Sequence, residues 1–306
     1  MALVALAVVA AVLALLPFVI SDYHTYLMAQ VGIFFIAILG LNILTGYTGQ
    51  ISIGHGAFMA IGGYTTAIVS RDHHTNLLVT MLIAFAICFL AGLLFGLPAL
   101  RLSGAYLALA TFALALSVQY LPLQWSVYLG GSGGVHTSTT KSNVWLYGVA
   151  WGTAAVLFTL AWLILRGRVG RAFRSVRDSE IAAAASGVEI GIYKTLAFAI
   201  SAAFCGVAGS LFVMWTEGFA QPQEFDVGLS LTLLVGVAVA GLGSLWGILV
   251  GALFVALLPQ VSTSVPVIGN EHGRDVFYGL LVILVMLVLP NGFAGLLARL
   301  RALVRA

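Results

Sequence analysis

Long apolar runs separated by short polar stretches dominate this sequence and limit the folds that it can adopt. Of its 306 residues, 61% are hydrophobic and only 8% are charged. Soluble domains carry about 25% charged residues, so this chain has too few charges to cover a water-exposed surface. The runs also lack the strict alternation of polar and apolar residues that is typical of a membrane β-barrel. We therefore expect an all-α, polytopic helical membrane protein.

Nine apolar stretches are candidates for membrane-spanning helices. The first could be mistaken for a cleaved leader, but it lacks a basic start and further apolar stretches follow closely, so we expect a retained helix. The third is shorter than the roughly 20 residues that a straight helix needs to cross a bilayer, which predicts a half-helix or a continuation of the polar break before it. The nine stretches lie near residues 3–20, 27–45, 57–70, 77–98, 104–123, 144–165, 195–217, 228–258 and 275–292.

The stretch 228–258 is too long for a single crossing and carries the sequence GLGSLWG, Gly241–Gly247, near its middle. The positive-inside rule decides how it folds, because basic residues gather on both sides of it and both clusters should be cytoplasmic. An even number of crossings must then separate the clusters, so we expect two short helices that turn on the cytoplasmic side. This gives about ten segments in one transmembrane domain, residues 1–306, with both termini cytoplasmic. The basic clusters are Arg166, Arg168, Arg171, Arg174 and Arg177, followed by Lys194, and then Arg299, Arg301 and Arg305.

The stretch 42–66, NILTGYTGQISIGHGAFMAIGGYTT, interrupts the apolar pattern with six glycines and several hydroxyls. Each glycine costs a helix up to about 1 kcal/mol relative to alanine, so Gly46 and Gly49 predict an unwound segment. Gly62 and Gly63 instead suit close packing between helices. Unwound backbone at membrane depth is tolerated only where it is buried in protein or lines a wet cavity. Two interpretations stay open: a lining of the substrate path, and a tight turn near the cytoplasmic face.

The polar members of this stretch are the candidate residues of a translocation path. For the histidine, a packed and hydrogen-bonded side chain is favoured over a proton carrier, because no second ionisable group accompanies it. The candidates are Gly46, Thr48, Gly49, Gln50, Ser52 and His55.

Residues 166–195, RGRVGRAFRSVRDSEIAAAASGVEIGIYKT, form a long segment that is polar and still favours a helix. Asp178 or Ser179 can cap a short helix over EIAAAAS that ends at Gly187, and a second short helix is expected at 189–195. The small alanines would let a partner protein approach closely. The alternative is a basic loop that is attracted to anionic lipid.

These segments together resemble the membrane subunits of branched-chain amino acid ABC importers, the LivH/LivM permease family. The block RLSGAYLALAT is similar to the M-type, or LivM-like, subunit. Relatives in this family transport urea, short amides and aromatic acids, so the substrate is less defined than the family. The matching residues are LTGYTGQISIGHGAFMAIGGYT (44–65), RLSGAYLALAT (101–111), GGSGGV (130–135), GRAFRSVRDSEIAAAASGV (170–188), GLGSLWG (241–247) and LPNGFAGLL (289–297).

The resemblance implies a permease subunit in the bacterial cytoplasmic (inner) membrane, with a fold similar to type II importers such as those for vitamin B12. Its implied partners are a second, LivH-like permease in a heterodimer, two ATP-binding subunits of the LivG/LivF kind, a periplasmic substrate-binding protein and membrane lipid. Residues 167–194 would be the coupling segment. The residues implied to face the ATPase are Arg171, Arg174, Arg177, Asp178, Glu180, Ala184 and Gly187.

Other function classes fit the sequence less well. No G-x-x-x-x-G-K-[ST] motif is present and neither Lys141 nor Lys194 follows a glycine, so ATP and its Mg²⁺ would be bound by partner subunits and no cofactor by this chain. An enzyme or a proton-coupled secondary transporter would place ionisable groups in mid-span, whereas all ten acidic residues lie in loops or at span ends. The net charge of +3 reports topology and does not indicate a nucleic-acid partner.

Two loops and the two cysteines have plain interpretations. The loop 129–143 is expected to be a flexible turn beneath a docked binding protein, with an anion-binding nest of backbone N–H groups as the alternative. The sequence DHHT, residues 72–75, lacks the further ligands that a metal site needs. Cys88 and Cys205 are expected to be small buried hydrophobes.

Overall fold

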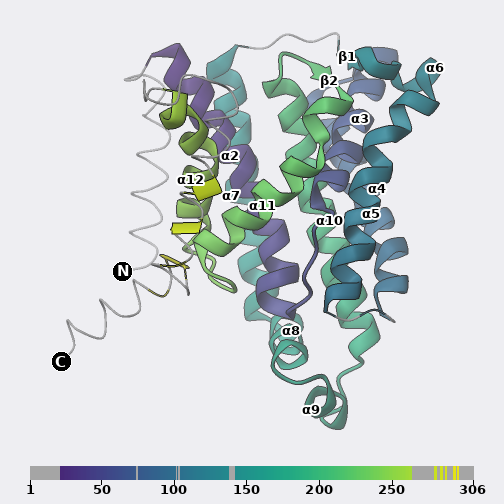
Figure 1. Ribbon diagram of the computed structural model, residues 1–306, viewed down its shortest axis with the longest axis vertical. Helices are drawn as coiled ribbons and strands as arrows, with labels where there is room; N and C mark the ends of the chain where they lie inside the picture. The colour runs from purple at the N-terminus through teal and green to yellow at the C-terminus, as the bar shows by residue number, and fades with distance from the viewer. Residues whose placement is uncertain are drawn as a thin grey trace, which may run out of the picture.

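The structure is a computed structural model that describes residues 21–73, 75–100, 102, 104–137 and 142–263, with isolated positions between 279 and 295. Over these residues it is a bundle of helices (Figure 1). Several sequence-based expectations lie outside the described residues. They are the span 3–20, most of the span 275–292, most of LPNGFAGLL, Arg101, Lys141, and the C-terminal Arg299, Arg301 and Arg305.

Within the described residues, five helices are long and apolar enough to cross a membrane. They are α2 (Asp22–Asn42) with its π-helical continuation Ile43–Tyr47, α4 (Leu77–Ala99), α5 (Ala105–Gln124), α7 (Asn143–Arg166) and α10 (Ile190–Trp215). Helix α3 (His55–His73) and the shorter apolar helices α11 (Val227–Ala240) and α12 (Ile248–Thr263) complete the bundle. The expectation of an all-α polytopic membrane fold is confirmed.

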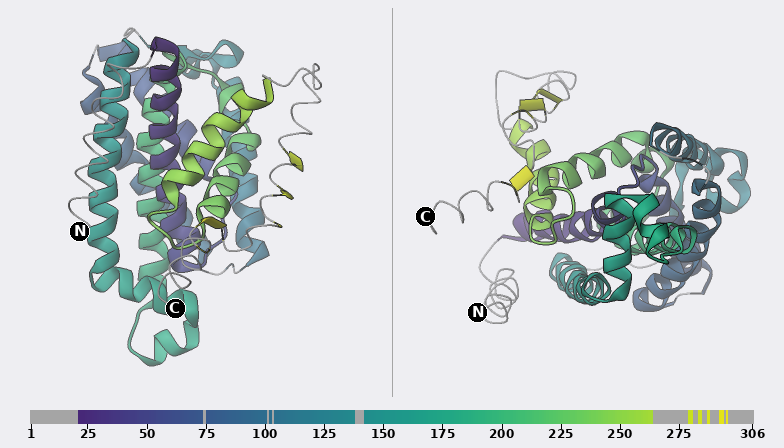
Figure 2. Two further views of the ribbon diagram at one scale, coloured as in Figure 1. Left: turned by 90° about the vertical axis from the view of Figure 1, so that its left-hand side faces the viewer. Right: turned by 90° about the horizontal axis from the view of Figure 1, so that it is seen from below.

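The remaining elements are short and lie at the two ends of the bundle. Helices α8 (Arg168–Asp178) and α9 (Glu180–Ala185) project from one end. At the other end lie α6 (Ser126–Leu129), the 3₁₀ turns Gly131–Gly133 and Pro222–Phe225, and a two-stranded antiparallel sheet of β1 (Val135–His136) with β2 (Phe219–Ala220). The left-hand view of Figure 2 shows from a second side that α8 and α9 extend beyond the long helices.

Helices α2 and α10 form the centre of the bundle. In each, 89% of the most apolar stretch is buried inside the chain, compared with 28% in α5 and α7. Helix α10 packs against α2, α3 and α4, while α7 and α12 pack on α2. Because α4, α5 and α7 are apolar on their exposed faces as well, those faces suit lipid or another membrane subunit.

Close packing of α3, α10 and α4 depends on glycine, as the sequence predicts for Gly62 and Gly63. A Cβ on Gly62 would collide with the backbone of Gly206, and a Cβ on Gly206 would collide with Cys88. In the same way, a Cβ on Gly209 would collide with the backbone of Met59. Small residues at such crossings let helices approach to backbone contact, which gives the packing that holds membrane helices together. Both Cys88 and Cys205 are buried and free, as expected.

Two expectations about helix lengths are wrong. Residues 57–70 do not form a half-helix, because α3 runs over 19 residues, about 28 Å at 1.5 Å per residue. Its polar ends extend the helix past the apolar stretch, since His55 finds hydrogen-bond partners inside the protein. Residues 189–195 do not form a separate short helix either. They are the first turns of α10, which continues unbroken from Ile190 to Trp215.

The stretch 228–258 does form two helices, as expected. Helices α11 and α12 hold 14 and 16 residues, and Gly241–Gly247 lies in the turn between them. Gly241 and Gly243 adopt positive φ angles of 91° and 76°, a conformation that favours glycine. The turn lies at the same end of the bundle as the arginine-rich segment, because Gly243 lies beside Arg177.

At the opposite end, residues 129–137 contain regular structure, where a flexible turn was expected. They form a 3₁₀ turn and then β1, in which Val135 pairs with Ala220 and His136 with Phe219. Arg71, in the last turn of α3, donates to Asp72 at 2.7 Å, so its charge is paired with the next residue. This pairing accounts for a basic residue at the end where the positive-inside rule disfavours one.

We expect Gly62→Leu to destabilise the fold by at least about 1–3 kcal/mol, because the new side chain would force α3 away from α10. Thermal unfolding of the detergent-solubilised chain measures this. The matched control is Gly152→Leu on α7, where a Cβ meets nothing within 4 Å. Equal melting temperatures for the two variants would contradict the packing described above.

Candidate functional site

The chain unwinds between α2 and α3. Regular helix ends in the π-helical turn Ile43–Tyr47 and resumes at His55, so Gly49 to Gly54 form an extended connection. Figure 1 shows this connection rising from the α8 end of the bundle toward its interior before α3 begins. Gly49 adopts φ 72°, which lets the backbone leave the helix there. We call residues 43–55 the helix break.

The polar side chains of the helix break mostly point inward. Thr48 donates to the carbonyl of Leu44 at 2.6 Å and accepts from the Gln50 amide at 3.0 Å. The same amide Nε2 lies 3.3 Å from the carbonyl of Lys194 on α10. The buried Oε1 of Gln50 has no donor among the described residues, so this amide keeps one acceptor unused.

His55 joins three helices through a chain of buried hydrogen bonds. Its Nδ1 lies 2.8 Å from Ser52 Oγ, and its Nε2 lies 2.7 Å from Ser201 Oγ on α10. Ser201 in turn donates to the carbonyl of Gly40 on α2 at 2.7 Å. The Ser201 hydroxyl donates its single hydrogen to that carbonyl, so it can only accept from His55. The neutral imidazole of His55 therefore donates through Nε2 and accepts from Ser52 at Nδ1. This arrangement is that of the packed, hydrogen-bonded histidine which the sequence favours.

The start of α3 is capped by hydroxyls from other helices. The backbone N–H of Ile53 donates to Thr111 on α5 at 3.0 Å, and that of Gly56 donates to Ser230 on α11 at 2.9 Å. The first N–H groups of a helix have no intrahelical acceptor, so these hydroxyls satisfy groups that lipid could not. Sequence analysis missed Thr111, Ser201 and Ser230. Their only signal is a lone hydroxyl within an apolar helix.

The six candidate path residues are therefore neighbours with different exposures. Thr48, Gln50, Ser52 and His55 are buried, as is Gly46, whereas Gly49 is exposed. The exposed side chain of Ile51 lies between these polar residues, and the sequence analysis did not single it out.

The arginine-rich segment forms two short helices that meet at Ser179. Its hydroxyl accepts from the N–H of Ala182 at 3.3 Å and caps α9, as the sequence predicts. At the other end, Gly187 has φ 81°, and the N–H groups of Gly187 and Val188 donate to the carbonyls of Ala184 and Ala183. These two bonds make a Schellman motif that closes the helix.

Helix α9 presents one large apolar side chain that sequence analysis missed. Ile181 is 86% exposed at the projecting tip, whereas Ala183 beneath it is buried. Around it, Glu180, Ala184 and Gly187 are exposed as well. An isolated isoleucine within a polar, alanine-rich segment is the signal that could have identified this position.

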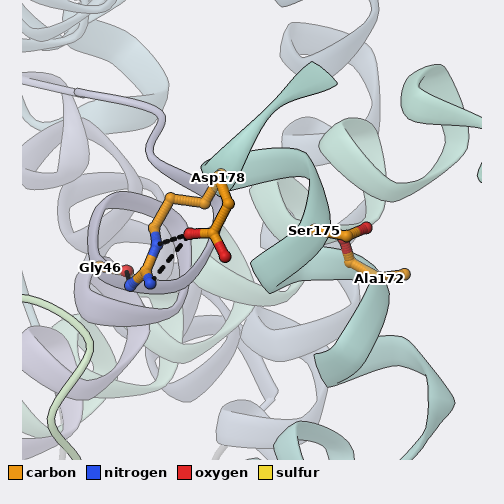
Figure 3. Close-up of polar contacts among 5 residues, drawn as sticks. Gly46, Ala172, Ser175 and Asp178 are labelled. Carbon is orange, nitrogen blue, oxygen red and sulfur yellow. Dashed lines mark hydrogen bonds and ion pairs between the residues drawn. The ribbon is translucent and has the colours of Figure 1, made fainter. Parts of the chain in front are cut away.

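On α8, the candidate arginines differ in where they lie. Arg171 is exposed and Arg174 is half-buried, above an inner face of Ala172, Phe173 and Val176. Arg177 instead donates from Nη1 to the carbonyl of Gly46 at 3.0 Å, and from Nε and Nη2 to Asp178 at 3.2 Å. Figure 3 shows the guanidinium group between that carbonyl and the carboxylate of Asp178.

The contact between Arg177 and Gly46 closes the end of α2. Gly46 carries one of the last carbonyls of the helix, which have no intrahelical donor and hold a partial negative charge. A cation at this position stabilises a helix by about 0.3–1 kcal/mol. The side chain fits because a Cβ on Gly49 or on Gly243 would come within 3.1 Å of it.

The α11–α12 turn and the start of α10 join the same cluster. Asn42 accepts from the N–H of Gly243 at 2.9 Å and donates to the carbonyl of Ser244 at 3.1 Å. Lys194, whose side chain is only 8% exposed, pairs with Glu180 at 2.6 Å. Residues 171–187, which we call the docking segment, are thus bonded to the helix break directly through Arg177 and indirectly through Lys194.

Comparisons with known proteins agree on one family. The sequence model described as "Branched-chain amino acid transport system / permease component" matches residues 23–288. The high-affinity branched-chain amino acid transport system permease proteins LivM of Salmonella typhimurium and Escherichia coli are each 30% identical to the chain over 90% of its length and 71% of theirs. The autoinducer 2 import system permease protein LsrC of Klebsiella pneumoniae is 29% identical over 49% of this chain and 44% of its own. No solved structure matches the chain.

We expect Ser201→Ala to destabilise the fold by about 1–3 kcal/mol, because it leaves the buried Nε2–H of His55 without an acceptor. Ser210→Ala is the matched control on the same helix. Ser210 is equally buried, but its hydroxyl only donates to the carbonyls of Gly62 and Gly206. Removing this hydroxyl therefore leaves no buried donor without an acceptor. Thermal unfolding in detergent compares the two variants. If Ser210→Ala lowers the melting temperature as much as Ser201→Ala, the proposed role of His55 is wrong.

Proposed function

The chain belongs to the branched-chain amino acid transport permease family, and on that premise we propose that it moves leucine, isoleucine or valine inward by alternating access. As a permease component it is not itself catalytic and binds no cofactor. The energy comes from ATP with its Mg²⁺ on partner subunits, and a periplasmic binding protein delivers the substrate. The observation that carries this proposal is the projecting docking segment that is bonded to a helix break.

The docking segment is where the two ATP-binding subunits attach. Ile181 on α9 offers an apolar anchor within a segment that is otherwise polar or made of small residues. The other residues of this segment proposed to face the partner are Arg171 and Arg174 on α8, Glu180 and Ala184 on α9, and Gly187 after α9. This composition resembles a protein interface more than a lipid contact, because an isoleucine that projects from the end of the bundle lies outside the hydrocarbon layer. Five arginines at this end, from Arg166 to Arg177, support a cytoplasmic position.

The second permease subunit completes the membrane domain as a LivH-like partner, with lipid around the pair. Helices α4, α5 and α7 carry apolar side chains on faces that this chain does not cover, and these faces can contact the second subunit and lipid. At the opposite end, the β1–β2 sheet holds His136 against Phe219 with ring centroids 4.4 Å apart, next to the exposed Glu217. This sheet and the turns beside it form the surface on which the binding protein docks in this proposal.

The helix break borders the substrate path in this proposal. Gly49 and Ile51 are exposed, and Gln50 between them is buried with an Oε1 that no donor among the described residues satisfies. Gly46, Thr48, Ser52 and His55 hold the shape of the break from behind. Such a wall of backbone, hydroxyls and aliphatic groups binds substrate weakly, which suits a path that passes substrate on and leaves selection to the binding protein.

Two alternatives remain for testing. The similarity to autoinducer 2 import permeases supports variation of substrate within the family, so urea, short amides or other amino acids are the competing substrates. A secondary transporter without an ATPase is the runner-up mechanism.

We expect ATP-dependent uptake of radiolabelled leucine by vesicles that contain this chain and the partner subunits encoded beside it, with the binding protein outside. Uptake should disappear when the ATP-binding subunits carry an inactivating substitution. Uptake that persists would favour a secondary transporter. ATP-dependent uptake of another substrate but not of leucine, isoleucine or valine would leave the importer in place and correct its substrate.

We expect Ile181→Glu to weaken binding of the ATP-binding subunits at least about tenfold, because it places a charge in the centre of the proposed interface. Co-purification of the complex from detergent measures this. Val127→Glu is the matched control, since Val127 is also 86% exposed but lies on α6 at the other end of the molecule. Intact co-purification of the Ile181→Glu variant would show that α9 is not the docking site.

A further inference from the structure

Arg177 occupies a special position within the docking segment. Its side chain contacts two connections between helices, namely the helix break after α2 and the turn between α11 and α12. It donates to Gly46 in the first and lies beside Gly243 in the second. The other candidate arginines of α8 are the exposed Arg171 and the half-buried Arg174.

The geometry around Arg177 fixes its orientation. Asp178 holds Nε and Nη2, which leaves Nη1 directed at the carbonyl of Gly46. The guanidinium group is planar and rigid, so a rotation or shift of α8 changes the position of Nη1. Gly49 and Gly243 meet opposite parts of the side chain, Cγ and Nη1, with no side chains of their own to absorb the movement.

The helix break, which Arg177 contacts, is less constrained than a regular helix. Helix interiors resist distortion because each residue is held by intrahelical bonds, whereas the extended connection from Gly49 to Gly54 is held by a few bonds to other helices. The side chains that hold this connection and the residues on either side of it divide into two groups. Thr111, Ser201 and Ser230 belong to the membrane helices and bond Ile53, His55 and Gly56, whereas Arg177 belongs to the docking segment and bonds Gly46.

We propose that Arg177 is a positioning residue that transmits movement of the docking segment to the helix break and to the α11–α12 turn. This inference rests on the proposed function, because it assumes that ATP-binding subunits move α8 and α9. It changes the role of Arg177 from a residue that faces the ATPase to one that faces the membrane domain. Lys194 provides a second connection, since its side chain pairs with Glu180 and its carbonyl accepts from Gln50.

The first test measures coupling in the reconstituted complex. Arg177→Gln should assemble with the ATP-binding subunits and hydrolyse ATP at a rate near that of the unmodified complex, while uptake per ATP falls about tenfold. Arg168→Gln removes the same charge from the same helix, at its exposed first residue, and should leave both rates unchanged. The proposal is overturned if Arg177→Gln lowers hydrolysis and uptake in proportion, leaves both unchanged, or prevents assembly.

The second test follows the helix break directly. Ile51→Cys introduces an exposed thiol into a chain whose native Cys88 and Cys205 are buried. The rate of labelling by a maleimide should differ between the nucleotide-free complex and the complex trapped with ATP and vanadate. Adding Arg177→Gln should abolish this difference. A purely structural role would change the labelling rate in both states and keep their ratio.

The outcomes separate this inference from the proposed function. If the unmodified complex shows no ATP-dependent uptake, the proposed function fails. If it does show uptake but Ile51→Cys labels equally in both nucleotide states, the inference alone fails. Should Arg177→Gln yield no folded protein, Arg177→Lys decides, because an ammonium group keeps the charge but not the fork that joins Asp178 to Gly46. Full coupling in Arg177→Lys would then overturn the proposal.

Discussion

Every backbone group that leaves a helix inside a membrane needs a hydrogen-bond partner from the protein, and this requirement organises the bundle. The connection between α2 and α3 meets it with side chains from other segments. Thr111 and Ser230 accept from the N–H groups near the start of α3, and Arg177 donates to the carbonyl at the end of α2. A single interruption thereby ties together helices that are distant in the sequence.

The same requirement links the membrane interior to the end of the molecule. The carbonyls at the end of a helix need donors, and two kinds of side chain supply them here. Thr48 donates to the carbonyl of Leu44, and Arg177 donates to the carbonyl of Gly46. A guanidinium group can supply such a donor from outside the bundle, through a long side chain that stays partly solvated. The arginine-rich helix α8 is therefore part of the membrane fold and does more than project from it.

The sequence was enough to predict the fold class, the caps of α9, the split of 228–258 and the packing role of Gly62, since each follows from local composition or from charge. It was not enough for α3 and for the start of α10, where apolar length alone set the expected ends. Arg177 is exposed, as the pattern of α8 predicts, but its hydrogen bond to Gly46 has no local signal because Gly46 lies 131 residues away in the sequence. Lone hydroxyls such as Ser201 and Thr111 carry no local signal, because their partners lie on helices that only the fold brings together.

Helix α9 is held at both ends by contacts within this chain. The hydroxyl of Ser179 closes one end, the Schellman motif at Gly187 closes the other, and Lys194 of α10 pairs with Glu180 in the first turn. A segment that is already ordered loses little conformational entropy when it binds, and more of its contact energy appears as affinity. A rigid tip also conveys displacement without bending, so it can serve as a lever for a partner that moves by only a few ångströms.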